Sequence, residues 1–259
     1  MIDTVLFDLD DTLVVEYRSA DEAFIETINL IEHRIHKDEF IKAIRYQARE
    51  QWYKLPTIDY CLKVGISSWE ALWADFTGEQ ENLKQLKSLA DTYRFETWNE
   101  TLHRFNINNP EVAFKLGNEF KRIRNSKHVL YPDTLDILNF LKPVYKLGLI
   151  SNGAPDLQWK KINGSNLKHY FDCIVISGEH GYGKPDARLF SAAMNGLKAA
   201  KSRTIMIGDS LESDIKGAKN FGLKTIWINR NNHPTCDLKP DYEIDYLLKI
   251  KDILSESLT

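Results

Sequence analysis

Two patterns of apolar and polar positions divide this chain. Short runs of β-branched and other apolar residues occur near the start and throughout the second half, as in 4–8 (TVLFD) and 203–209 (RTIMIGD). Between about residues 14 and 129, apolar residues instead recur every three or four positions, which is the spacing of one helix face. The short runs are typical of buried strands in a parallel sheet, whereas the middle block predicts helices.

The helical block also carries helix start signals. Ser19 with Glu22, and Ser67 with Glu70, have the spacing of a capping box, in which two side chains satisfy the first turn. The Asn-Pro pair at 109–110 predicts another helix start, because proline is tolerated in a first turn. No strand is expected in this block.

After residue 129, strands and helices alternate. We expect strands at 144–151, 171–177, 203–209 and 223–229, with helices between them and a closing helix at 244–254. This alternation predicts an α/β fold: a Rossmann-like parallel sheet covered by helices on both faces, which the first strand joins. The expected domains are therefore a core, residues 1–13 and 130–259, and an inserted all-helical domain, residues 14–129.

Composition narrows the class of protein. The chain has 259 residues, a formal net charge of −3, and 43% hydrophobic and 27% charged residues, which is typical of a globular protein. There is no basic footprint for nucleic acid and no apolar run of the roughly 20 residues that a membrane span needs. Three widely spaced cysteines and no signal peptide indicate reduced thiols in a cytoplasmic protein.

Polar side chains follow the predicted strands at one edge of the sheet. Asp8 and Asp10 end the first run, Ser151 ends the next, and Asp209 follows a later one. Lys184 lies in the loop after the strand at 171–177. In open α/β sheets, ligands bind beyond the carboxyl ends of the strands. Carboxylates and a lysine would be costly to bury there unless they held a metal and an anion.

Four motifs in this order resemble the haloacid dehalogenase superfamily of phosphohydrolases: DLDDT at 8–12, SNG at 151–153, GKP at 183–185 and GDSLESD at 208–214. The helical block is similar to the helical cap domain that this superfamily inserts between its first two motifs. Residues 149–229 resemble the branch that contains pyrimidine 5'-nucleotidases and N-acylneuraminate-9-phosphatases.

The resemblance implies a Mg²⁺-dependent phosphatase acting on a small phosphorylated metabolite, such as a nucleotide or a sugar phosphate. Asp8 would attack the phosphorus and form an aspartyl phosphate, which divides a very slow hydrolysis into two easier steps. Asp10 would protonate the departing alcohol and then deprotonate the attacking water. A carboxylate repels a phosphate dianion, so the site needs cations.

The same resemblance assigns the other positions. Phosphate would be bound by Ser151 and Lys184, together with backbone amides near Leu9 and Asn152. The metal would be held by the carboxylates of Asp8 and Asp209 and by the backbone carbonyl of Asp10. Two further residues would support these groups: Thr12 would stabilise the turn after the first strand, and Asp214 would lie next to the metal.

Several alternatives remain or are rejected. A P-loop reading of 178–184 (GEHGYGK) fails, because Pro185 stands where a Ser or Thr must bind magnesium. Asp10 argues against a dehalogenase, since a departing halide needs no proton, and phosphonatases likewise lack this acid. A phosphomutase and a catalytically silent binding protein remain open. So do the substrate and the oligomeric state, monomer or homodimer.

Overall fold

The computed structural model describes residues 1–31, 35–234 and 238–256, and contacts divide the chain into two compact units. The sheet unit comprises residues 1–15, 129–152 and 165–259, and the helical unit comprises 16–128 and 153–164. The predicted domain boundaries, at residues 13/14 and 129/130, remain a prediction and lie within two residues of the divisions at 15/16 and 128/129. They differ in one segment, 153–164, which the sequence prediction assigned to the core and which groups with the helices.

Six parallel strands form the sheet, in the order β3-β2-β1-β4-β5-β6. The strands are β1 (Thr4–Phe7), β2 (Lys146–Ser151), β3 (Cys173–Ile176), β4 (Thr204–Gly208), β5 (Lys224–Ile228) and β6 (Tyr242–Ile244). The parallel α/β prediction is confirmed, and its five strands are all present. The sixth, β6, was not predicted: its sequence, YEI, is too short and too polar to show as a buried run.

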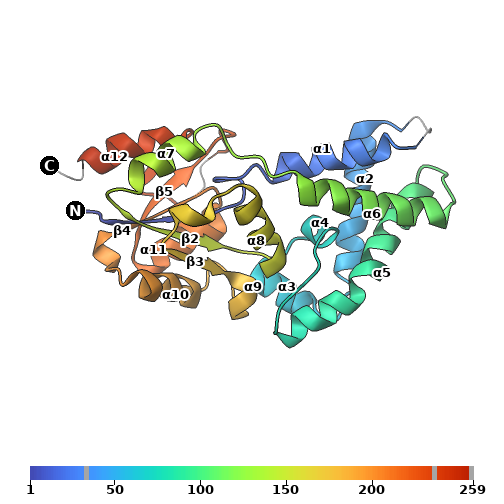
Figure 1. The fold of residues 1–259 in the computed structure, drawn as a ribbon, viewed down its shortest axis with the longest axis horizontal. Coiled ribbons are helices and arrows are strands. Elements are labelled where there is room, and N and C mark those ends of the chain that lie inside the picture. Colours follow the sequence, from blue (N-terminus) through green and yellow to red (C-terminus); the bar gives the residue numbers. More distant parts are fainter. Residues whose placement is uncertain (32–34, 235–237, 257–259) are drawn as a thin grey trace. The chain divides into compact units, whose positions relative to one another are not determined.

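Helices cover both faces of this sheet, with α7 and α12 on one side and α10 and α11 on the other (Figure 1). Alternate strand residues, including Leu6, Ile150 and Met206, pack against α10 and α11 in one buried cluster. The helical elements of the sheet unit are α7 (Thr134–Leu141), η1 (Lys168–Tyr170), α9 (Ser177–His180), α10 (Ala187–Leu197), η2 (Lys201–Arg203), η3 (Leu211–Ile215), α11 (Lys216–Phe221), η4 (Leu247–Lys249) and α12 (Ile250–Glu256).

The helical unit is built on an aromatic core. Phe24 stacks on Phe120 with ring centroids 4.3 Å apart, and Trp98 packs against both rings. No strand occurs in its described residues. Its helices are α1 (Tyr17–Ile28), α2 (Lys37–Trp52), α3 (Ile58–Val64), α4 (Ser68–Ala71), α5 (Glu81–His103), α6 (Pro110–Ser126) and α8 (Pro155–Gly164).

The predicted helix starts had different outcomes. The capping box of Ser67 and Glu70 is present at the start of α4, and Asn109 caps α6. The prediction for Ser19 was wrong, because α1 begins two residues earlier, at Tyr17, and its first turn has no side-chain cap. The apolar face of α1 is buried as expected, so helical periodicity located the helix and the capping pattern misplaced its start.

Four buried charges join separate parts of the helical unit. Arg124 donates two hydrogen bonds to Glu16, at 2.9 and 2.7 Å. The Lys161 ammonium lies 2.6 Å from a carboxylate oxygen of Glu70 and 3.3 Å from one of Glu16. Two cations therefore balance two carboxylates. Because Lys161 belongs to α8, this cluster explains why α8 groups with the helices rather than with the sheet.

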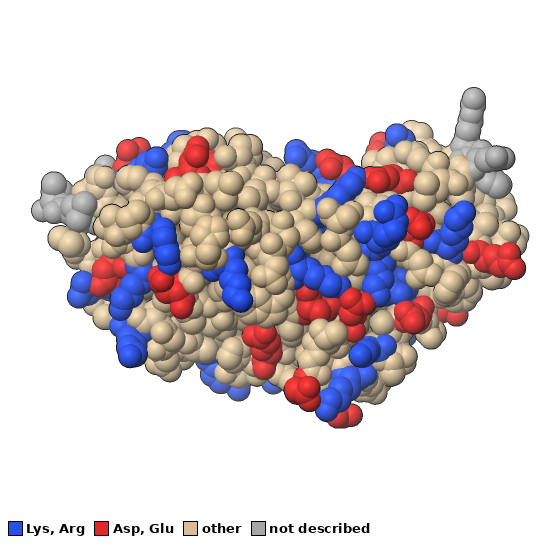
Figure 2. Space-filling view, viewed as in Figure 1, with Lys and Arg blue, Asp and Glu red and all other residues tan. Residues whose placement is uncertain are grey.

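The surface carries both signs of charge. Basic and acidic side chains are interspersed over the face shown in Figure 2, without a broad area of one sign. Among the described residues, no helix is long and apolar enough to cross a membrane.

Candidate active site

The strand order places the functional residues at a topological switch point. From β1 the chain adds β2 and β3 on one side of the sheet and β4, β5 and β6 on the other. In such sheets the ligand crevice lies at the carboxyl ends of the two strands where the order reverses, here β1 and β4. Asp8 directly follows β1 and Asp209 directly follows β4. Two residues remote in the sequence therefore become neighbours.

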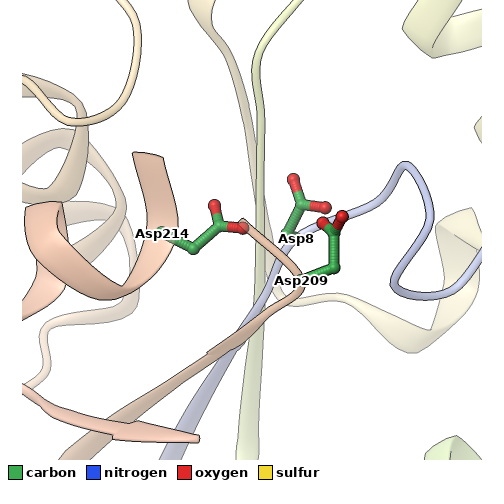
Figure 3. Close-up of side chains that lie close together, drawn as sticks. All are labelled: Asp8, Asp209 and Asp214. Atoms are coloured by element: carbon green, nitrogen blue, oxygen red, sulfur yellow. The ribbon is translucent and has the colours of Figure 1, made fainter. Parts of the chain in front are cut away.

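Three carboxylates meet at this point. Asp8, Asp209 and Asp214 each present an oxygen within 4.8 Å of the others, and Asp8 and Asp214 are buried. Figure 3 shows the three side chains converging from the ends of β1 and β4 and from the helical turn after β4. Asp10 and Thr12, also predicted for this site, lie in the loop after β1.

One lysine lies against these carboxylates. The buried ammonium of Lys184 contacts Asp8, lies 2.7 Å from an Asp214 oxygen, and donates to the backbone oxygen of Ile150 at 2.8 Å. The ammonium therefore makes two hydrogen bonds, to Asp8 and Ile150, and an ion pair with Asp214. The lysine is therefore fixed in direction by partners from β1, β2 and the turn after β4.

The Asn152 side chain binds the backbone of the loop that carries Lys184. Its side-chain oxygen accepts from the Lys184 backbone nitrogen at 2.8 Å, and its amide nitrogen donates to the Lys184 carbonyl at 2.9 Å. This reciprocal pair joins the end of β2 to the loop after β3. Ser151, predicted to contact phosphate, is buried and ends β2 at the same edge of the sheet.

A single π-helical turn, η3, brings Asp214 back to the site. Ser210 caps this turn by accepting a hydrogen bond from the Ser213 backbone nitrogen, and Asp214 accepts from the Ser210 backbone nitrogen at 3.0 Å. Such turns occur often at functional sites. Gly208 is required beside it, because a Cβ atom there would lie 2.3 Å from an Asp214 oxygen.

The loop after β1 closes on itself. Asp11 has a φ of 56°, and its backbone nitrogen donates to the carbonyl of Val14 at 2.7 Å. The Thr12 hydroxyl donates to Asp209 at 3.4 Å, a long contact between the loops after β1 and β4. Sequence reasoning missed Trp227, whose indole nitrogen donates to the Asp209 carbonyl at 2.7 Å. The available signal was a tryptophan within a mostly apolar predicted strand, because a buried indole N–H needs a hydrogen-bond partner.

The crowding of carboxylates perturbs their protonation. Burial raises the pKa of Asp8 to about 6, with Lys184 opposing this and Asp214 adding to it. The pKa of Asp209 lies well above its ordinary value, first because of burial and then because of the charges of Asp8 and Asp214. The pKa of Lys184 is raised despite its burial, because both carboxylates favour its charged form.

These residues fit a hard divalent cation. Three oxygen donors are already close together, and burial, followed by the charges of Asp8 and Asp214, raises the pKa of Asp209 although Lys184 lowers it. Carboxylate oxygens are the ligands that Mg²⁺ prefers. A small dication would remove the repulsion and keep all three groups ionised.

Comparisons with known proteins agree with this geometry. Residues 2–222 match the family model of haloacid dehalogenase-like hydrolases. The chain belongs to this family. It is 31% identical over 256 residues to a phosphoserine phosphatase of Thermus thermophilus, covering 98% of this chain and 99% of that protein. It is also 31% identical to the pyrimidine 5'-nucleotidase YjjG of Escherichia coli over 185 residues, covering 71% of this chain and 77% of that protein.

Other relatives extend the comparison. An N-acylneuraminate-9-phosphatase of Mus musculus is 28% identical over 256 residues, covering 96% of this chain and 92% of that protein. The hydrolase YfnB of Bacillus subtilis, solved with magnesium, has the same fold, with a TM-score of 0.67 at 23% identity and 98% coverage of both chains. The L-2-haloacid dehalogenase PA0810 also shares the fold, with a TM-score of 0.67 at 20% identity and coverage of 99% and 100%. The family predicted from the four motifs is confirmed.

Proposed function

We propose that this protein is a Mg²⁺-dependent phosphatase that hydrolyses a small phosphate monoester through an aspartyl-phosphate intermediate on Asp8. One observation carries the proposal. A carboxylate nucleophile, a buried lysine and two further carboxylates converge at the switch point of the sheet, although Asp8 and Lys184 are 176 residues apart. The phosphatase relatives that align over nearly the whole chain support the same chemistry.

Each residue has a role that its chemistry supports. Asp8 attacks the phosphorus and the alcohol leaves, and water then attacks the acyl phosphate and restores Asp8. Asp10 gives its proton to the leaving alcohol and takes one from the attacking water. Lys184 and Ser151, with the backbone amide of Asn152, bind the phosphate oxygens and offset their charge.

Asp8, Asp209 and the backbone carbonyl of Asp10 would hold Mg²⁺, with Asp214 beside them. The ion supplies positive charge that lets a carboxylate approach a phosphate dianion and stabilises the transition state. The protein, in turn, keeps the carboxylates oriented through Lys184, Thr12 and the turn η3.

A dehalogenase is the competing activity within this fold, since dehalogenases share it. Asp10 favours the phosphatase, because an alkoxide leaving group needs a proton and a halide does not. A phosphomutase would keep the same residues, but it would need a bisphosphorylated activator and release little inorganic phosphate. A silent binding protein would bind phosphate esters without releasing phosphate.

A substrate panel tests the proposal. Phosphoserine, pyrimidine nucleoside monophosphates, N-acylneuraminate 9-phosphate and simple sugar phosphates are assayed for phosphate release with and without Mg²⁺, alongside 2-chloropropionate for halide release. We expect phosphate release that requires the metal. Asp8→Asn should lower it by roughly 10⁴-fold or more, while the matched control Asp11→Asn, in the same loop, keeps most of the rate. Phosphate release by Asp8→Asn at the parent rate, or halide release alone, would refute the mechanism.

A further inference from the structure

The loop that follows β1 is also contacted by a charged side chain outside the candidate active site, Arg230. Arg230, in the segment after β5, donates from Nη2 to the Thr12 carbonyl at 3.2 Å. The next carbonyl, that of Leu13, accepts from the Thr134 hydroxyl at 2.8 Å. The far end of the loop is therefore held by side chains from two other parts of the sheet unit.

Arg230 is itself fixed by an ion pair. Its guanidinium donates to both oxygens of Asp133, at 2.9 and 3.2 Å, and lies 3.8 Å from the ring centroid of Tyr131. Asp133 is fully buried and also accepts from the Leu247 backbone nitrogen at 2.6 Å. The Arg230 side chain is 12% exposed. Little freedom remains for the group that holds Thr12.

The loop transmits this restraint to the reacting groups. Asp10 forms a backbone bridge with Val14, so Thr12 lies within a closed turn that begins at Asp10. We therefore expect a shift at Thr12 to displace Asp10. The Thr12 hydroxyl in turn contacts Asp209. A displacement of about 1 Å in a catalytic group can cost roughly 100-fold in rate.

We propose that Arg230 is a positioning residue for catalysis, which together with Asp133 holds the loop so that Asp10 reaches the leaving-group oxygen. Arginine suits this task, because its planar fork binds a carboxylate with two N–H groups and also donates to a carbonyl. Lysine, with a compact ammonium, cannot reproduce this geometry. The inference rests on the proposed phosphatase activity.

The test compares two leaving groups. An alkyl phosphate releases an alkoxide that needs the proton of Asp10, whereas p-nitrophenyl phosphate releases a stable phenolate that does not. If Arg230 positions Asp10, then Arg230→Met should lower kcat/KM for the alkyl ester roughly 10- to 100-fold more than for the aryl ester. This ratio reports formation of the aspartyl phosphate, whereas kcat also includes the later attack of water, which is common to both esters. Arg230→Lys should show the same selective loss, smaller in size.

Arg203→Met is the matched control, since Arg203 also pairs with an aspartate, Asp3 at 2.5 Å, but is 56% exposed. It should change neither rate. Each variant is checked for native circular dichroism at the assay temperature, and if Arg230→Met does not fold, Arg230→Lys carries the comparison. Equal loss on both esters, or no loss on either, would overturn the positioning role. If the parent releases phosphate from neither ester, the proposed function fails instead.

Discussion

Replacing Lys184 by methionine tests whether the candidate site is held together by charge. The side chain is 1% exposed and contacts two carboxylates, Asp8 and Asp214. Methionine keeps much of the volume and removes the ammonium. Three neighbouring carboxylates, Asp209 included, then lose their buried cation.

The magnitude follows from the geometry. At the 2.7 Å that separates Lys184 from Asp214, a charge pair in a medium of effective dielectric constant about 20 attracts by roughly 6 kcal/mol. Burying the charge of Lys184 costs the parent several kcal/mol, and the variant does not bear this cost. The expected net loss of folding free energy is therefore about 3–5 kcal/mol, the usual cost of breaking a buried pair. Such a loss would lower the urea midpoint of the sheet unit by about 1–2 M.

Hydrogen exchange of the amides in β1 and β4 is the appropriate assay. Tryptophan fluorescence would mostly report the helical unit, because Trp227 lies in β5 and the other tryptophans lie in residues 16–128 and 153–164. The control is Lys142→Met, since Lys142 pairs with Asp172 at 2.6 Å but is 34% exposed. The control should lose no more than about 1 kcal/mol.

Mg²⁺ provides a second measurement. With three carboxylates and no lysine, the variant should be stabilised more by added Mg²⁺ than the parent is, because the ion then supplies the positive charge that Lys184 provided. A folded Lys184→Met variant that loses no more stability than the Lys142→Met control would refute the electrostatic account of this site.

Three further predictions follow from the structure. Asp10→Asn should lower kcat for an alkyl phosphate by about 10²- to 10⁴-fold with little change in Mg²⁺ affinity measured by calorimetry, and a large loss of affinity would contradict its role as an acid and base. Gly208→Ala should lower Mg²⁺ affinity about 10-fold or more, because the added Cβ collides with Asp214; unchanged affinity would show that the contact is irrelevant. Burial raises the pKa of Glu16, but its cationic neighbours outweigh this and bring the pKa below its usual 4.5. Glu16→Gln should therefore cost about 3 kcal/mol at pH 7, and urea unfolding followed by fluorescence should show the difference from the parent shrinking as the pH falls below 4.5, whereas a constant difference would contradict the charge cluster.

Local sequence patterns were enough to predict most of the fold. The short apolar runs located five strands because parallel strands are buried on both faces. They missed β6, an edge strand of three residues with glutamate at its centre. The assignment of α8 to the helical unit had no local signal, since it depends on Lys161 meeting partners more than 90 residues away.

The candidate site, too, could be predicted only in part from the sequence. Placement at strand ends brought Asp8, Lys184 and Asp209 to one edge, because topology alone determines where such residues go. The side-chain partners could not be derived from the sequence. The backbone amide of Asn152 was predicted to bind phosphate, but nothing in the sequence indicated that its side chain bonds the backbone of Lys184. Trp227 and Arg230 act from β5 and the segment after it, at positions without a motif.

The position of β1 in the middle of the sheet has a consequence for biosynthesis. β1 is made first, but its neighbours β2 and β4 begin at Lys146 and Thr204. At typical translation rates, the 197 residues between Thr12 and Asp209 take about 10–40 s to synthesise. Until β2 has been made, β1 has no partner on either edge, and its other edge stays unpaired until β4 has been made. β1 therefore stays incompletely paired for longer than the helical segments stay unfolded, and the site can form only when Asp209 and Asp214 have been made.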